Sequence, residues 1–154
     1  MTWTLTTIAQ SLAAYLAPLL PETTFYEDPN QQGTKAPCIF LQQRYANTRL
    51  YPSGRWLRTI GLDLTCLEDY NLPDLQRRYL RTAELLDAAL ETWPYTDGQS
   101  PAVLVRSHDR SWSIDQDALH YKFEVKAWVE APVDAAKMET MQLKQGMKEE
   151  THEN

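Results

Sequence analysis

The 154-residue sequence is poor in glycine and has no excess of basic side chains. Five glycines leave few places where backbone could approach a phosphate group closely, and there is no glycine-rich phosphate-binding loop. A formal net charge of −6 argues against a free-standing nucleic-acid binder, because phosphate neutralisation needs clustered lysine and arginine in excess. No stretch approaches the roughly 18 apolar residues of a membrane span. We therefore expect a cytosolic protein without membrane insertion or sequence-specific binding to nucleic acid.

Cysteine is equally scarce, and the familiar catalytic signatures are missing. Cys38 and Cys66 lie in separate apolar runs without cysteine or histidine neighbours, so we interpret both as buried, reduced thiols. His108 and Asp109 are adjacent, but neighbouring residues of a strand point to opposite faces, which favours an ordinary polar strand end. The sequence contains neither GxSxG nor HExxH. It therefore predicts no catalytic, cofactor-binding or metal site, and we expect no enzymatic activity.

Two helices are predicted from apolar residues at three- and four-residue spacing. The first runs from about residue 4 to 17 and ends before Pro18. The second begins at Asn71 as its N-cap and carries Pro73 in its first turn, where a missing N–H costs nothing. We expect it to end at the Trp93-Pro94 pair, since proline disrupts a helix interior.

Alternation of apolar and polar residues predicts the strands. They are expected at residues 23–27, 38–50, 56–67, 102–107 and 119–130, with a polar bend at 109–116. We expect only one face of the strand over 56–67 to be buried. This order, α-β-β-β-α-β-β, predicts an α+β domain over residues 1–131, in which an antiparallel or mixed sheet of four to five strands carries both helices on one face.

Charge is strongly segregated along the chain. No acidic residue lies between Asp28 and Asp63, so this segment carries +5 and the rest of the chain carries −11. Arginine mixed with aromatic residues is a composition typical of protein interfaces. The predicted interface residues are Arg44, Tyr45, Arg49, Tyr51, Arg55, Trp56 and Arg58. A basic hairpin on an acidic body can pair head to tail with the next copy and close a ring. A merely solvated hairpin, or a surface that stacks single-stranded nucleic acid, remains an alternative.

Residues 132–154 are predicted to be a C-terminal tail or arm, because their composition shifts to lysine, glutamate and glutamine. Four apolar side chains interrupt this solvated composition: Met138, Met141, Leu143 and Met147. Methionine adapts to irregular partner surfaces, so these residues are candidates for an arm that becomes ordered on a neighbouring molecule. A solvated tail with incidental methionines is the alternative.

Several segments together resemble one known family. They are KAPCIFLQQ (35–43), RWLRTIGLDLTCLE (55–68), LLDAALE (85–91), LHYKFEVKAWVE (119–130) and METMQLKQG (138–146), preceded by the opening amphipathic helix. In this order they resemble the small tail terminator, or tail completion, proteins of long-tailed bacteriophages and prophages. The resemblance covers most of the chain and consists of patterns rather than a diagnostic motif.

This resemblance implies a structural protein of virion assembly. Members of the family form hexameric rings that cap the completed tail tube, stop its polymerisation and provide the head-attachment surface. The implied partners are further copies of the chain, the tail tube protein and a head-completion or connector protein. The implied location is the host cytoplasm during assembly and then the head-proximal end of the tail. Two alternatives stay open: a head–tail connector (neck) protein, and an α+β module that binds a small molecule or peptide between sheet and helices.

Overall fold

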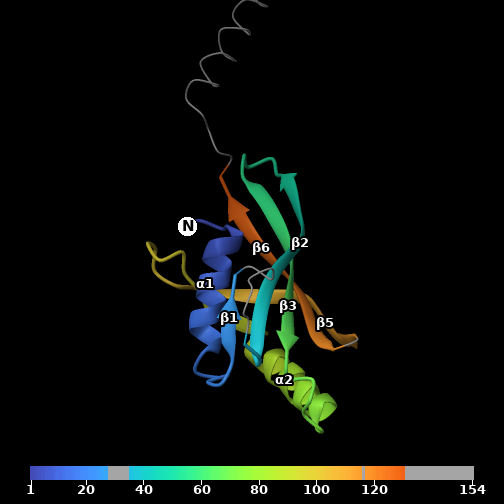
Figure 1. Cartoon of the computed structure of the whole chain (residues 1–154). Coiled ribbons are helices and arrows are strands. Elements are labelled where there is room, and N and C mark those ends of the chain that lie inside the picture. Colours follow the sequence, from blue (N-terminus) through green and yellow to red (C-terminus); the bar gives the residue numbers. More distant parts are fainter. Residues whose placement is uncertain (28–34, 116, 131–154) are drawn as a thin grey trace, which may run out of the picture.

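The computed structural model describes residues 1–27, 35–115 and 117–130. Its elements are α1 (Leu5–Leu16), β1 (Thr24–Tyr26), β2 (Cys38–Leu50), β3 (Trp56–Leu67), α2 (Leu75–Ala89), β4 (Thr92–Tyr95), β5 (Val103–Asp115) and β6 (Ala118–Val129). The strands form one sheet in the order β1-β2-β3-β6-β5-β4, curled into a half-barrel (Figure 1). The sheet is mixed, because β1 pairs with β2 in parallel and the other described pairs are antiparallel.

The predicted fold, with four to five strands in the order α-β-β-β-α-β-β, is wrong. In the described part of the chain the sheet has six strands, and the order of elements is α-β-β-β-α-β-β-β. The additional strand is β4, which contains the Trp93-Pro94 pair that we expected to end the second helix. That helix ends at Ala89, and the chain turns into β4 within three residues. Pro94 is tolerated there because β4 is the edge strand of the sheet, where a missing N–H need not remove a hydrogen bond between strands.

The predicted bend at residues 109–116 is also wrong, because β5 continues to Asp115. The strand pairs with β4 through residues 103–106 and then with β6 through residues 107–115, so it bridges two parts of the sheet. A β-bulge between His108 and Ser111, with Asp109 at a φ of 49°, accompanies this change of partner. The polar sequence reflects a partly exposed strand rather than a loop.

The start of α2 differs from the prediction as well. Asp74, not Asn71, occupies the N-cap position, and its side chain makes no capping hydrogen bond. Asn71 instead lies in a preceding turn, where its N–H donates to the Asp69 carboxylate at 3.0 Å. This local turn competes with helix formation, so Pro73 lies before the helix rather than inside it.

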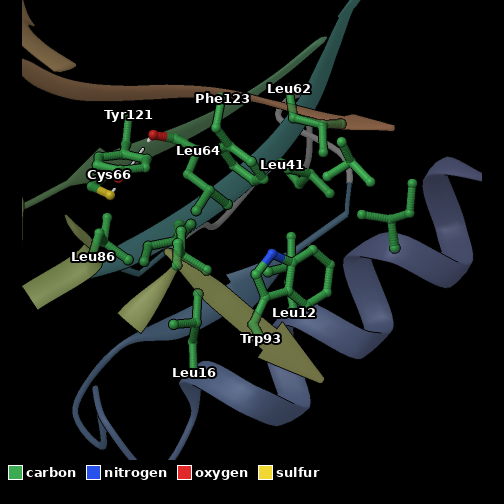
Figure 2. Packing of buried hydrophobic residues seen from close by; sticks show 14 of the residues in the cluster. Leu12, Leu16, Leu41, Leu62, Leu64, Cys66, Leu86, Trp93, Tyr121 and Phe123 are labelled. Carbon is green, nitrogen blue, oxygen red and sulfur yellow. Dashed lines mark hydrogen bonds between the residues drawn. The ribbon is translucent and has the colours of Figure 1, made fainter. Parts of the chain in front are cut away.

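The core fills the concave side of the sheet. Helix α1 contacts both β2 and β4, which lie far apart in the strand order, because the curl of the sheet brings them to either side of the helix. Its residues Ile8, Leu12 and Leu16 are fully buried. Figure 2 shows Leu12 and Leu16 beside Trp93 and the side chains of the central strands.

The central strands show the alternation expected from the sequence. In β6, Leu119, Tyr121, Phe123 and Val125 are all 0% exposed and face the helices, while the residues between them are half-buried. Both cysteines are buried and free, as predicted. Burial raises the pKa of the Cys66 thiol, which keeps it protonated near neutral pH.

Candidate assembly interface

The hairpin end of β2 and β3 projects beyond both helices, together with the end of β6 (Figure 1). Its turn is closed by two backbone hydrogen bonds. The Tyr51 N–H donates to the Arg55 carbonyl at 3.0 Å, and the Gly54 N–H donates to the Tyr51 carbonyl at 2.9 Å. Gly54 has a φ of 80°, a left-handed conformation that favours glycine. The seven predicted hairpin residues lie in β2, β3 or this turn.

Four side chains form a contiguous arginine–aromatic cluster on the convex face of this end: Arg49, Tyr51, Arg55 and Trp128. The Arg55 guanidinium carbon lies 4.5 Å from the centre of the Trp128 ring, and the Tyr51 ring meets Trp128 edge-on at 5.0 Å. The Arg49 guanidinium carbon lies 5.5 Å from the centre of the Tyr51 ring. Trp128 nevertheless remains 45% exposed, so the cluster presents a large aromatic surface to solvent.

Trp128 was missing from the predicted interface. The sequence does carry a signal for it, because Trp128 is the one apolar residue on the otherwise polar face of the last strand. Its contact with the hairpin depends on the pairing of β3 with β6, which places Trp128 opposite Leu57, the residue that Arg49 faces from the other side. Strands distant in the sequence create this contact, so local patterns do not reveal it.

Trp56 and Arg58 do not join the cluster, although both were predicted with it. Trp56 lies between Leu50 and Val129 in the register, and these three side chains point to the concave face. Leu50 is 66% exposed there, since the helices end before this part of the sheet. The projecting end therefore carries arginine and aromatic side chains on its convex face and a smaller apolar surface on its concave face.

Arg44 and Tyr45 lie away from the cluster, at a β-bulge between Gln43 and Tyr45. The Tyr45 ring covers Gly61 on β3, and its hydroxyl donates to the Glu124 carboxylate on β6. This hydrogen bond is the main cause that raises the pKa of Tyr45. Tyr45 thus braces three strands within one molecule, whereas Arg44 is exposed with its guanidinium 5.3 Å from the centre of the Tyr45 ring.

A second polar group lies on the same convex face, at Asp63, Thr65 and His120. We expected this face of the strand to be exposed, but Asp63 is 7% exposed and Thr65 is 9% exposed. His120 Nδ1 lies 3.1 Å from the Asp63 carboxylate and 3.3 Å from the Thr65 hydroxyl. A catalytic triad needs the carboxylate and the nucleophile on different ring nitrogens, and here both lie at Nδ1. The geometry matches a structural hydrogen-bond network.

Two cavities beside the helices are relevant to the alternative function, a module that binds a small molecule or peptide. One of about 300 Å³ lies between α2 and residues 19–23, which follow α1. Its charged lining includes Arg78 and Glu68, which pair with each other at 3.4 Å. Another of about 110 Å³ lies between α1 and β2 and has a largely apolar lining that includes Leu12 and Leu41. Neither lining by itself identifies a ligand.

Comparison with known proteins adds no family assignment: no family model matches the chain, and no curated protein matches it.

Within residues 1–27, 35–115 and 117–130, no group of three or more histidine, cysteine or acidic side chains could hold a metal ion. No helix in that part of the chain is long and apolar enough to cross a membrane. The predicted contact residues Met138, Met141, Leu143 and Met147 lie outside the described residues.

Proposed function

We propose that the protein is a structural assembly protein that associates with copies of itself into a ring, as do the tail terminator proteins that its sequence resembles. The observation that carries this proposal is the arginine–aromatic cluster on the projecting end of the sheet. Tryptophan, tyrosine and arginine are the residues that dominate binding energy at protein interfaces. In this cluster Trp128 is stacked against one arginine and still half exposed to solvent.

Charge supports a contact between unlike surfaces of two copies. The segment between Asp28 and Asp63 carries +5, whereas the remainder carries −11. A symmetric contact between two hairpins would place arginines against arginines, which is unfavourable. A head-to-tail contact places the hairpin of one copy against the acidic remainder of the next. Such a contact between unlike surfaces closes into a ring when the rotation between copies allows it.

The ring then acts by occlusion at the end of a tail tube. It adds to the last layer of tail tube protein and offers no further tube-like edge, so polymerisation stops. Its opposite side provides a surface for a head-completion or connector protein. The resemblance of the sequence to tail terminators supports these partners, together with assembly in the host cytoplasm and a final place at the head-proximal end of the tail.

Reversal of one hairpin charge should weaken self-association. We expect Arg49→Glu to raise the dissociation constant at least about tenfold, which corresponds to ~1.4 kcal/mol, because it places an acidic group against an acidic surface. Light scattering over a range of protein and salt concentrations measures this, and raised salt should also weaken association of the wild type. Arg77→Glu is the matched control, because Arg77 is also exposed but lies on α2. Wild-type protein that remains monomeric would contradict ring formation.

Capping of a tube is tested separately. Purified tail tube protein from the same phage or prophage is allowed to polymerise, and electron microscopy records tube lengths with and without the added protein. We expect shorter tubes with a ring at one end. Unchanged tube lengths with binding to a head protein would instead favour the connector alternative, and unchanged lengths without any binding would contradict both assignments.

A further inference from the structure

The edge of β2 is open along most of its length. β1 pairs only with Cys38–Phe40, whereas β2 continues to Leu50 with β3 on its other side. Within the part of the chain that the structure describes, no strand pairs with this edge over residues 42–50. An unpaired edge of this length is a ready template for another strand.

The register shows which backbone groups are open. The hydrogen bond from the Tyr51 N–H to the Arg55 carbonyl marks Tyr51 as a residue that bonds across the hairpin. In an antiparallel pair every second residue forms backbone hydrogen bonds with the partner strand, so Asn47 and Arg49 also form backbone hydrogen bonds with β3. The N–H and C=O groups of Ala46, Thr48 and Leu50 therefore point away from β3, and all three residues are exposed.

The same end of the sheet has a second open edge, on β6. The pairing of β5 with β6 ends at Ser107 and Val125, and among the residues that the structure describes Lys126–Val129 pair only with β3. Trp56 and Arg58 of β3 do not bond to β2, so their backbone groups point to β6 and bond to Val129 and Ala127. The backbone N–H and C=O groups of Lys126 and Trp128 therefore point away from β3. One three-stranded end thus presents two open edges on opposite sides.

We propose that residues 46–50 of β2 in one copy add to residues 126–129 of β6 in a second copy, so that the sheet continues from one molecule to the next. This rests on the proposed self-association and specifies its contact. Edge-to-edge pairing supplies main-chain hydrogen bonds, and side chains on the two faces supply specificity.

The apolar side chains of the two edges are complementary. On the concave face, Leu50 of β2 would meet the apolar Ala127 and Val129 of β6, which shields a leucine that is now 66% exposed. On the convex face, Arg49 would meet Trp128, over which Arg55 of the same copy already lies, together with the exposed Lys126 and Glu130, so the apolar contact is the main contribution to complementarity. Pairing of β2 with β2 of a second copy is less favourable, because it places the arginines of both copies along one junction.

Proline at position 48 tests the main-chain contact. Thr48→Pro removes an N–H that points away from β3, so the hairpin ladder is retained while the open edge loses a donor at its centre. We expect the dissociation constant of the assembly to rise at least about tenfold, with an unchanged circular dichroism spectrum. Thr48→Val is the control, since it keeps the N–H, and it should associate within about twofold of the wild type. A proline variant that is folded and assembles like the valine variant would overturn the proposal.

Hydrogen exchange of the unmodified protein gives a second, independent test. In the dilute monomer, the amide protons of Ala46, Thr48 and Leu50 should exchange rapidly, while those of Asn47 and Arg49 are protected by β3. On assembly, at least two of the first three should become protected, because Lys126 and Trp128 offer two open carbonyl groups, and the other two should change little. A side-chain contact alone would not produce this alternating pattern, so rapid exchange at all three positions in the assembly would overturn strand addition.

The two proposals fail in different ways. Assembly with rapid exchange at Ala46, Thr48 and Leu50 overturns the strand pairing and leaves self-association standing. Wild-type protein that stays monomeric at every concentration overturns the proposed function, and the strand pairing with it.

Discussion

Replacement of Trp93 by alanine should lower the free energy of unfolding by about 3–5 kcal/mol. Trp93 is 0% exposed, lies beside α1 in the core and meets the Tyr95 ring edge-on, with 6.1 Å between the ring centres. Its indole N–H donates to the Ser107 hydroxyl at 3.0 Å, in a buried position. The substitution therefore opens a large cavity and leaves a buried hydroxyl without this partner. Urea unfolding followed by circular dichroism measures the loss.

The control for this substitution lies on the same pair of strands. Leu104 is opposite Pro94 in the register of β4 and β5, but it is 73% exposed. Leu104→Ala should change the free energy of unfolding by no more than about 0.5 kcal/mol. Similar effects of the two substitutions would mean that β4 is not docked in the core in the way described.

Gly61→Ala should lower the free energy of unfolding by about 1–3 kcal/mol, although the change adds only a methyl group. A Cβ atom on Gly61 would overlap the Tyr45 ring, with only 2.8 Å to its Cδ1 atom. The ring would have to leave the strand surface, which also breaks the hydrogen bond between the Tyr45 hydroxyl and Glu124. Thermal or urea unfolding of the variant measures this cost.

A double-mutant cycle separates this overlap from a general effect of alanine in the strand. In a Tyr45→Ala background the obstruction is gone, so Gly61→Ala should be neutral or stabilise by up to about 1 kcal/mol, because alanine loses less backbone entropy than glycine. The coupling energy between the two positions should therefore exceed about 1 kcal/mol. Equal costs in both backgrounds would show that Tyr45 does not cover Gly61.

The roles of the predicted interface residues depend on the face of the sheet on which each lies. Tyr51 and Arg55 contact Trp128 and Arg49 lies over Tyr51, whereas Trp56 points to the opposite face. Tyr45 is engaged within its own molecule, so its substitution would change stability as well as any contact it makes. Tests of assembly should therefore use Arg49 and Thr48, whose side chains are exposed.

The sequence by itself determined the elements whose stabilisation is local. The boundaries of β2 and β3 agree with the predicted ranges, because their alternation is long and a proline- and glycine-containing turn joins them. Helix α1 is likewise close to its predicted range, since one apolar stripe and the following proline define it. The uneven distribution of charge is also a property of the sequence alone.

Only the tertiary structure decided which distant residues meet. β4 is too short and too atypical in sequence to be recognised locally, and it exists because β5 and the core stabilise Trp93 and Tyr95 in extended conformation. The contacts of Trp128 with Arg55 and Tyr51 and the two open edges of the sheet all follow from the strand order. Strand order is set by pairing between segments far apart in the chain, and that pairing is governed by burial of the whole sheet rather than by any local pattern.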